Sequence, residues 1–271
     1  MSFNIMELNN LRLAVLIDAE NVPRDCIKSV MKEIAIYGTP TIKRIYGDWT
    51  NPSVSGWKGS LLENAITPVQ QYSYTTGKNS SDSAMIIDAM DILYTGKTDG
   101  FVLVSSDSDF TRLAVRLREA GQRVIGIGER KTPGAFIAAC DKFIYIEVIR
   151  QNAAAEETQA EEQTGDAAQG QTQKQQKAEK AAKQQKQKPQ VPKKTVKMIA
   201  DSVADIAGDN EWVYMGELGN LILKTQPDFD PRNYGFKSLS AMIKSIPRFQ
   251  VDFRQSADPN IKHPYVRDKE N

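Results

Sequence analysis

Short apolar runs alternate with longer helical patterns through the first 150 residues of the chain. Apolar runs of about five residues are typical of strands buried on both faces of a sheet, and apolar residues spaced three and four apart are typical of helices. The expected strands are residues 13–17, 41–46, 66–70, 100–105, 123–127 and 143–145. The expected helices are residues 25–37, 83–94 and 110–120, the last ended by Gly121. The alternation predicts an α/β, Rossmann-like domain with a mainly parallel sheet and flanking helices.

The pattern changes at residue 151. Residues 151–192 contain no aromatic side chain and almost no aliphatic one larger than alanine, so they cannot bury a core. Their acidic residues come first and their lysines follow. We expect a disordered or partly helical linker, whose lysine run serves either as a solvated spacer or as a basic arm that attracts phosphates.

Apolar periodicity returns after the linker. Helices are expected at residues 196–207, 215–224 and 236–245, and a hairpin or wing at residues 249–253 and 264–266. The expected organisation is a domain at 1–150, a linker at 151–192 and a small winged-helix-like domain at 193–271.

Composition narrows the class of protein. No run approaches the roughly 18 apolar residues of a membrane span, and no signal peptide precedes the first strand, so we expect a soluble, cytoplasmic protein that does not bind membranes. Cys26 and Cys140 lie in apolar helical contexts and are expected to be buried thiols. The one histidine is His263, which excludes histidine-based zinc hydrolases and Ser-His-Asp hydrolases from the first domain.

Acidic residues follow the strands that we expect to be central. Asp18 follows one apolar run directly, and Asp107 and Asp109 follow another. Asp82 lies at the start of the helix expected at 83–94. Because the carboxyl ends of parallel strands share one edge of the sheet, these four carboxylates should converge there. Oxygen ligands without nearby His or Cys predict a site for Mg²⁺ or Mn²⁺.

Some of these acids have a structural alternative. Asp109 and Asp82 could each be the N-cap of the helix that follows. On the helix at 83–94, Asp88 lies on a flank as a supporting group and Asp91 faces solvent.

The same residues carry a family resemblance. The stretches LIDAEN at 16–21, KNSSDSAMIIDAMD at 78–91 and VLVSSDSDFTRLAVRLREAGQRVIGIG at 102–128 resemble the LabA-like branch of the NYN domain, which is a PIN-like nuclease. The resemblance implies that Asp18, Asp82, Asp107 and Asp109 are the catalytic metal ligands. It also implies that Asn21 orients substrate or water.

Phosphodiester hydrolysis assisted by one or two metal ions fits this resemblance. Lys78 and Arg112 are the candidate contacts to substrate phosphates. Trp49, Trp57 and Lys58 form an aromatic and basic group that could stack single-stranded bases, although both tryptophans could instead cover the core edge.

The C-terminal segment has its own resemblance. The stretches WVYMGELGNLIL, PDFDPRNYGFKSLSAMI and FQVDF resemble the LOTUS domain, also called OST-HTH. The resemblance implies binding of RNA or of a protein partner. The candidate phosphate-facing cations are Lys237, Lys244, Arg248, Arg254 and Lys262.

The hypothesis from the sequence is a ribonuclease that cuts single-stranded RNA held in part by a tethered LOTUS domain. The alternative is a catalytically weak RNA-binding or regulatory scaffold. A haloacid dehalogenase phosphatase would need an aspartate where Glu20 stands, and a Toprim domain would need a glutamate at Asp18. We therefore set both classes aside.

Overall fold

The computed structural model describes residues 11–72, 80–163, 190–207, 211–255 and 262–270. The chain divides into two compact units, Met1–Ala155 and Glu156–Asn271. No helix in these ranges is long and apolar enough to cross a membrane.

Six parallel strands form the sheet of the first unit. Their order is β3-β2-β1-β4-β5-β6, and every neighbouring pair runs in the same direction. The strands are β1 Arg12–Asp18, β2 Thr39–Gly47, β3 Thr67–Gln70, β4 Gly100–Val104, β5 Arg123–Gly128 and β6 Lys142–Tyr145. All six lie where the apolar runs predicted them, within one or two residues at their ends, and the predicted α/β class is confirmed.

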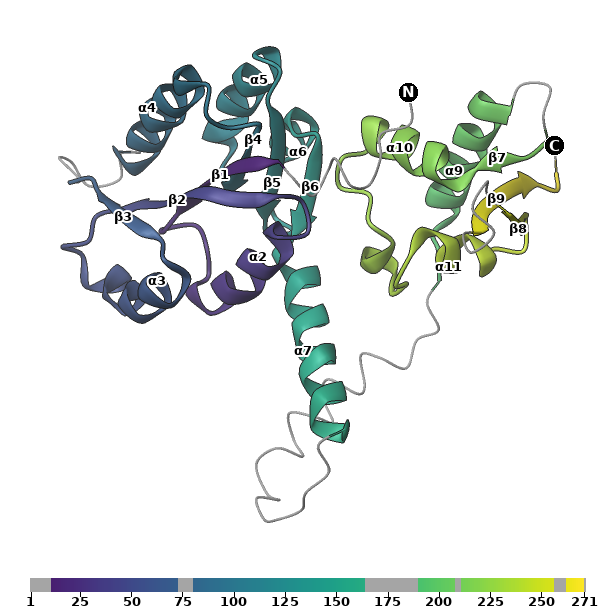
Figure 1. Ribbon diagram of the computed structural model, residues 1–271, viewed down its shortest axis with the longest axis horizontal. Coiled ribbons are helices and arrows are strands. Elements are labelled where there is room, and N and C mark those ends of the chain that lie inside the picture. Colours follow the sequence, from purple (N-terminus) through teal and green to yellow (C-terminus); the bar gives the residue numbers. More distant parts are fainter. Residues whose placement is uncertain (1–10, 73–79, 164–189, 208–210, 256–261, 271) are drawn as a thin grey trace. The chain divides into compact units, whose positions relative to one another are not determined.

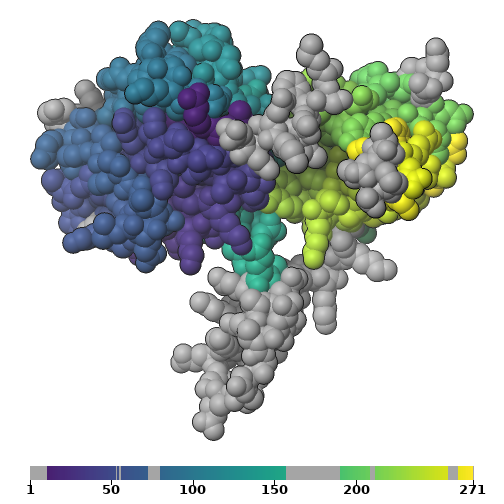
Figure 2. Space-filling model, in the orientation of Figure 1, coloured from purple at the N-terminus to yellow at the C-terminus, as the bar shows by residue number. Residues whose placement is uncertain are grey.

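Helices cover both faces of this sheet, as Figure 1 shows. Successive side chains of β1 point to opposite faces, so Leu13, Val15 and Ile17 enter one core and Ala14 and Leu16 enter the other. The first core packs against α2, α3 and the beginning of α7, and the second packs against α4, α5 and α6. In the space-filling view, α4 and α5 form one side of the unit, and α2 and α3 form the other (Figure 2).

The helices of the first unit differ from the expectation mainly in number. They are α2 Ile27–Ile34, α3 Lys58–Asn64, α4 Ser80–Thr95, α5 Thr111–Glu119, α6 Gly134–Ala139 and α7 Ile146–Gln163, with 3-10 turns η1 Arg24–Cys26, η2 Pro52–Trp57 and η3 Ser108–Phe110. The sequence did not predict α3 and α6, because helices of 7 and 6 residues are too short to establish a period. It also missed the start of α7, which follows β6 directly.

Two further expectations of the first unit are met. Gly121 follows α5 with a φ of 78°, the left-handed conformation that favours glycine at a helix end. Cys26 and Cys140 are free and buried, and burial raises the pKa of both thiols, to about 11 and about 12. Neither thiol is a nucleophile at neutral pH.

The second unit has helices and a small antiparallel sheet around one core. Its elements are α9 Lys193–Ala207, β7 Val213–Tyr214, α10 Met215–Thr225, η4 Pro231–Tyr234, α11 Leu239–Lys244, β8 Phe249–Gln255 and β9 Lys262–Asp268. The strand order is β7-β9-β8. Helix α11 begins later than expected, because the Ser238 side chain accepts a hydrogen bond from the Ala241 N–H and caps the helix there. Three helices and a hairpin match the predicted winged-helix-like arrangement.

Candidate functional site

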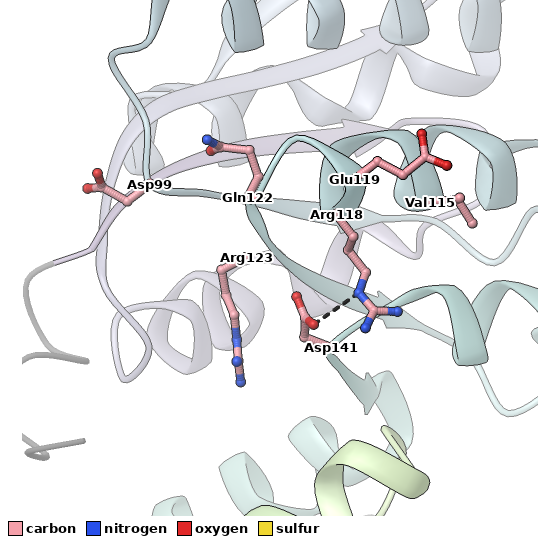
Figure 3. A pocket seen from close by; sticks show the side chains of 8 residues that line it. Asp99, Val115, Arg118, Glu119, Gln122, Arg123 and Asp141 are labelled. Carbon is pink, nitrogen blue, oxygen red and sulfur yellow. Dashed lines mark ion pairs between the residues drawn. The ribbon is translucent and has the colours of Figure 1, made fainter. Parts of the chain in front are cut away.

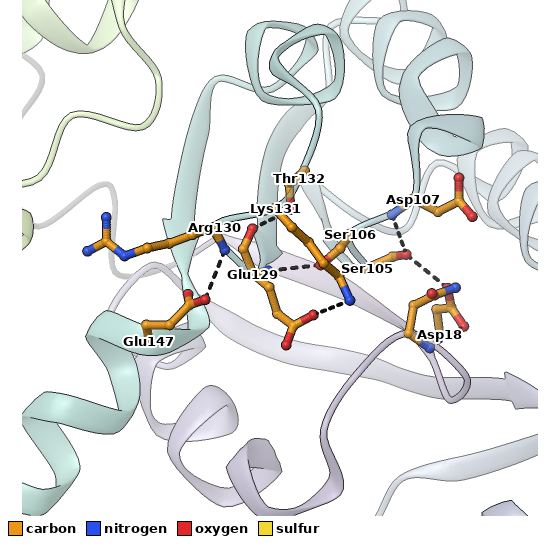
Figure 4. Close-up of polar contacts among 10 residues, drawn as sticks. Asp18, Ser105, Ser106, Asp107, Glu129, Arg130, Lys131, Thr132 and Glu147 are labelled. Atoms are coloured by element: carbon orange, nitrogen blue, oxygen red, sulfur yellow. Dashed lines mark hydrogen bonds and ion pairs between the residues drawn. The ribbon is translucent and has the colours of Figure 1, made fainter.

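The chain adds β2 and β3 on one side of β1 and then β4, β5 and β6 on the other side. In open parallel sheets, binding sites lie at the carboxyl ends of the two strands where the order switches, which here are β1 and β4. Ile17 of β1 pairs with Val104 of β4, so Asp18 and Ser105 leave the sheet side by side. The Ser105 hydroxyl donates a hydrogen bond of 2.9 Å to the Asp18 carboxylate (Figure 4). The candidate site is built around this contact.

The Asp18 carboxylate is held in one orientation by its own chain. Its Oδ1 accepts hydrogen bonds from the N–H groups of Glu20 (3.0 Å) and Asn21 (3.3 Å). Its Oδ2 accepts from the Asn21 side-chain amide (2.7 Å) and from Ser105. Asp18 is only 2% exposed. Asn21, which was expected to orient substrate or water, therefore contacts the Asp18 carboxylate and holds its orientation.

The loop after β4 places two further acids beside Asp18. Ser105 Oγ accepts a hydrogen bond of 3.1 Å from the Asp107 N–H, and Asp107 Oδ1 accepts one of 2.9 Å from the Asp109 N–H. Asp107 is thus the N-cap of η3, and Asp109 lies inside that turn. The alternative in which Asp109 caps the helix is wrong. Asp107 is half-buried and Asp109 is exposed.

Asp82, in the first turn of α4, is the fourth acid of the predicted set. It is the third residue of α4, so the alternative that it caps this helix is also wrong. Burial raises its pKa to about 7, and the charges of Asp18, Asp107, Asp109 and Glu20 add to the shift. The structure therefore brings all four predicted acids within electrostatic reach of one another. We call Asp18, Asp82, Asp107 and Asp109 the acidic cluster.

The same edge carries two acids that the sequence reasoning missed. Burial raises the pKa of Glu20, and so do the charges of Asp18 and Asp48. Asp48 directly follows β2, and its Oδ1 accepts hydrogen bonds from Thr50 and Gln70. The signal was available, since Asp48 follows its strand just as Asp18 follows β1.

Asp88 does not support the acidic cluster. Its carboxylate accepts hydrogen bonds from Arg44 and from the hydroxyl of buried Tyr46, both on β2, so it fastens α4 to the sheet. Asp91 is exposed, as expected.

The donor chemistry of the acidic cluster fits a hard divalent ion. Every candidate ligand is a carboxylate oxygen, which suits Mg²⁺ or Mn²⁺ rather than Zn²⁺. Buried Asp82 among like charges is the environment that a cation would relieve. In the part of the chain that the structure describes, no three Asp, Glu, His or Cys side chains are already arranged around one point to hold a metal.

The predicted phosphate-binding cations lie on different elements of the first unit. Arg112 on α5 and Lys58 on α3 are exposed, and Lys78 lies outside the described residues. The loop after β5 adds Arg130 and Lys131, which the sequence reasoning missed.

The loop after β5 is joined to the loop that carries Asp107. The Glu129 N–H donates to Ser106 Oγ at 2.9 Å, and the Lys131 ammonium pairs with the Glu129 carboxylate at 2.6 Å (Figure 4). Arg130 Cζ lies 5.3 Å from the centre of the Tyr145 ring. The hydrogen bond between Glu129 and Ser106 therefore keeps the loop of Arg130 and Lys131 beside the loop that carries Asp107.

The tryptophans have different surroundings from those expected. Trp57 is 3% exposed and belongs to the core under α2 and α3, so its ring cannot stack on a base and the expectation for Trp57 is corrected. Trp49 is half-buried and donates a hydrogen bond of 3.0 Å from Nε1 to the Val69 carbonyl. Both rings cover the core, which was the structural alternative.

The candidate cations of the second unit differ in their exposure and in the groups that they contact. Lys237 is exposed before α11, and the Lys244 ammonium lies 4.3 Å from the centre of the Phe253 ring. Arg248 pairs with buried Asp268 at 2.6 Å, so it is engaged within the fold.

A hollow of about 580 Å³ lies at the opposite edge of the parallel sheet, at the amino ends of β4 and β5 (Figure 3). Arg118 and Asp141 pair across it at 3.0 Å. Its lining is Asp99, Val115, Arg118, Glu119, Gly121, Gln122, Arg123 and Asp141. It contains no residue of the acidic cluster.

Three solved structures resemble parts of this chain. A protein of unknown function from Vibrio parahaemolyticus is 20% identical with a TM-score of 0.43, covering 51% of this chain and 94% of that one. A fragment from Chromobacterium violaceum is 27% identical with a TM-score of 0.24, covering 31% and 87%. An uncharacterised protein from Nitrosomonas europaea is 27% identical with a TM-score of 0.27, covering 39% and 89%. No curated protein matches the chain.

Two domain families match in succession. The family described as OST-HTH/LOTUS domain matches residues 186–261, which include α9, α10, α11 and β8. The family described as NYN domain matches residues 12–147, which is half of the chain and includes the acidic cluster. The chain therefore belongs to the NYN domain family, and its NYN domain is followed by an OST-HTH/LOTUS domain.

Proposed function

We propose that this protein is a divalent-metal-dependent ribonuclease that hydrolyses phosphodiester bonds in RNA. The observation that carries the proposal is the burial of Asp82 among the charges of Asp18, Asp107 and Asp109 at the switch point of the sheet. Such an arrangement is unfavourable without a cation, and a fold that needed only stability would not keep it.

The acidic cluster would hold the ion. When bound, Mg²⁺ or Mn²⁺ supplies positive charge that offsets the negative charge developing on the phosphate under attack. The chain's own contribution is orientation. Ser105 and Asn21 fix the direction of the Asp18 carboxylate, and the cap of η3 fixes that of Asp107. Such hydrogen bonds keep ligands in place before substrate arrives.

Cations on neighbouring loops would hold the RNA backbone. The Lys131 side chain is 69% exposed, and its pairing with Glu129 is a surface ion pair of small stabilising effect. The ammonium can therefore exchange this carboxylate for a substrate phosphate. Arg112 and Lys58 are exposed and would add further phosphate contacts. The LOTUS domain would bind the same RNA through a separate surface.

The test is a cleavage assay on labelled single-stranded RNA and DNA with Mg²⁺, Mn²⁺ or EDTA. We expect RNA cleavage that requires metal, and a rate lowered by orders of magnitude in Asp107→Asn. Asparagine keeps the side-chain oxygen that accepts the hydrogen bond from the Asp109 N–H, so the N-cap of η3 should be retained. Asp91→Asn, at an exposed position of α4, is the matched control. Full cleavage in EDTA, or an Asp107→Asn protein as fast as the parent, would exclude the mechanism.

One observation favours a second function, an RNA-binding scaffold with weak catalysis. The four hydrogen bonds to Asp18 satisfy its carboxylate without any metal, as a purely structural aspartate would require. A scaffold would bind RNA in the same assay without cutting it in either metal.

A further inference from the structure

The three-stranded sheet of the LOTUS domain has two chemically different faces. Residues paired across antiparallel strands share a face, and Val213 and Val251 both pair with Val266. This face joins the core of the domain. Tyr214 and Asp252 pair with Tyr265, so they lie on the other face, which faces solvent.

The outer face collects aromatic rings and guanidinium groups. Arg254 Cζ lies 4.9 Å from the centre of the Trp212 ring and 4.7 Å from that of Tyr265. Arg267 Cζ lies 5.1 Å from the Trp212 ring. The Tyr214 ring lies 5.7 Å from that of Tyr265.

The His263 ring extends this surface, because its centre lies 5.4 Å from that of Tyr214. All four rings are partly exposed. We call this continuous surface the aromatic face, and it consists of Trp212, Tyr214, His263, Tyr265, Arg254 and Arg267.

The contacts that hold this face together are individually weak. The valines on the other side of the sheet form the core, and an exposed cation–π contact contributes only about 0.5–1 kcal/mol. The two arginines have acidic partners, since Arg267 pairs with Glu211 at 2.6 Å and Arg254 with Asp252 at 3.4 Å. Those carboxylate side chains are 71% and 51% exposed, and surface pairs of this kind are weak. Both guanidinium groups can therefore exchange a carboxylate for a phosphate.

We propose that the aromatic face binds single-stranded RNA, with bases stacked on its rings and guanidinium planes and with phosphates paired to Arg254 and Arg267. The choice of RNA rests on the proposed function. Flat rings at neighbouring positions of an exposed sheet recognise the faces of unpaired bases, which a duplex conceals. Because every base has such a face, binding here is tolerant of sequence.

The test measures RNA binding by the full chain in EDTA, so that no cleavage intervenes. The probe is a fluorescein-labelled, unstructured RNA of about 12 nucleotides, within the usual range of site sizes, and the readout is fluorescence anisotropy. Trp212→Ala should weaken binding about fivefold or more, the effect of losing one stacking ring. Trp212→Phe should restore most of the affinity, because it restores a ring.

A second pair of variants separates stacking from charge. Arg254→Lys keeps the charge and loses the planar group, so it should weaken binding several-fold. Lys224→Gln removes an exposed cation from α10, which packs on the other side of the sheet, and should leave the affinity within about twofold, the change expected of a single rim charge. Thermal unfolding followed by circular dichroism checks that each variant is folded.

Parental affinity in folded Trp212→Ala and Arg254→Lys proteins would overturn the proposal, and the face would then belong to a protein partner. A stronger effect of Lys224→Gln than of Arg254→Lys would overturn it as well. Cleavage of the same RNA with Mn²⁺ is measured separately. If the parent protein does not cleave RNA but Trp212→Ala weakens RNA binding, only the proposed ribonuclease is contradicted. If the parent cleaves RNA and Trp212→Ala binds RNA as the parent does, only the proposed role of the aromatic face is contradicted.

Discussion

Replacing Asp82 by asparagine should stabilise the metal-free protein while abolishing cleavage. Burial and the charges of Asp18, Asp107, Asp109 and Glu20 raise the pKa of Asp82 from its ordinary 3.8 to about 7. The folded protein therefore holds this proton more tightly than the unfolded chain does. The resulting stabilisation is complete below about pH 4 and is lost as the pH rises through 7.

The size of the effect follows from the pKa difference. About 3 pKa units at about 1.4 kcal/mol each give an upper limit of about 4 kcal/mol for the cost of ionised Asp82 at pH 8. Asp82 is 7% exposed but lies at the open edge of the sheet, where solvent screens part of this cost, so the measured value should fall below the limit. Asparagine carries no charge at any pH and avoids the cost. At about 2–4 °C per kcal/mol for a unit of about 150 residues, the melting temperature should rise by at most about 8–16 °C.

Calorimetry of the full chain in EDTA at pH 5 and pH 8 measures this difference. The first unit of the parent should melt at a lower temperature at pH 8 than at pH 5, and Asp82→Asn should remove most of that decrease. Asp91→Asn, an exposed change on the same helix, should melt like the parent. Mn²⁺ should restore the parent at pH 8 and have little effect on Asp82→Asn.

One result would exclude a cation requirement at Asp82. If Asp82→Asn melts below the parent at pH 8 in EDTA, the Asp82 carboxylate is compensated within the fold. The acidic cluster would then need no cation, even if the protein cleaves RNA.

Two substitutions test how the loops at the carboxyl edge are positioned. Ser105→Ala removes the hydroxyl that donates a hydrogen bond to Asp18 and accepts one from the Asp107 N–H. Cleavage kinetics should show a kcat about tenfold lower or more and a KM that changes little. A parental kcat would exclude this positioning role. Gly128→Ala places a Cβ 2.6 Å from the Ser105 carbonyl and 2.7 Å from Thr132 Oγ1, so urea unfolding should show a loss of about 1–3 kcal/mol, and an unchanged midpoint would mean that the two loops can separate without cost.

Regular patterns explain what the sequence predicted correctly. The central strands β1 and β4 are buried on both faces, so continuous apolar runs marked them, and Asp18 and Asp107 were recognised as the first acids after these two runs. Asp48 obeys the same rule and was overlooked, because β2 is partly exposed and its apolar run is weaker.

The features that the sequence did not predict depend on tertiary contacts. Trp57 ends a 3-10 turn, where no period shows which side chains face the core. Asp88 contacts Arg44 and Tyr46 of a strand more than forty residues away, and no local pattern records such a pairing. Loop cations such as Lys131 have no periodicity at all, and only the hydrogen bond between neighbouring loops places this one near the acidic cluster.

Removing the LOTUS domain should change RNA affinity and leave the chemistry intact. A fragment of residues 1–163 keeps both cores of the first unit, the whole acidic cluster and all of α7. Its turnover number on a short RNA should therefore match that of the full chain.

The KM for a long RNA should rise about tenfold or more in this fragment, because a second contact on a tethered domain makes rebinding effectively intramolecular. The full chain should also lose RNA affinity more steeply with added salt, since the lost contacts are to phosphates. Both proteins are compared on a short and a long RNA at two salt concentrations. Trp212→Ala in the full chain should reproduce part of the increase in KM. That result would link the increase to the aromatic face and not to the length of the chain. Equal KM values and equal salt dependence would show that the LOTUS domain does not hold the substrate, and its exposed rings would then be available to recruit a protein.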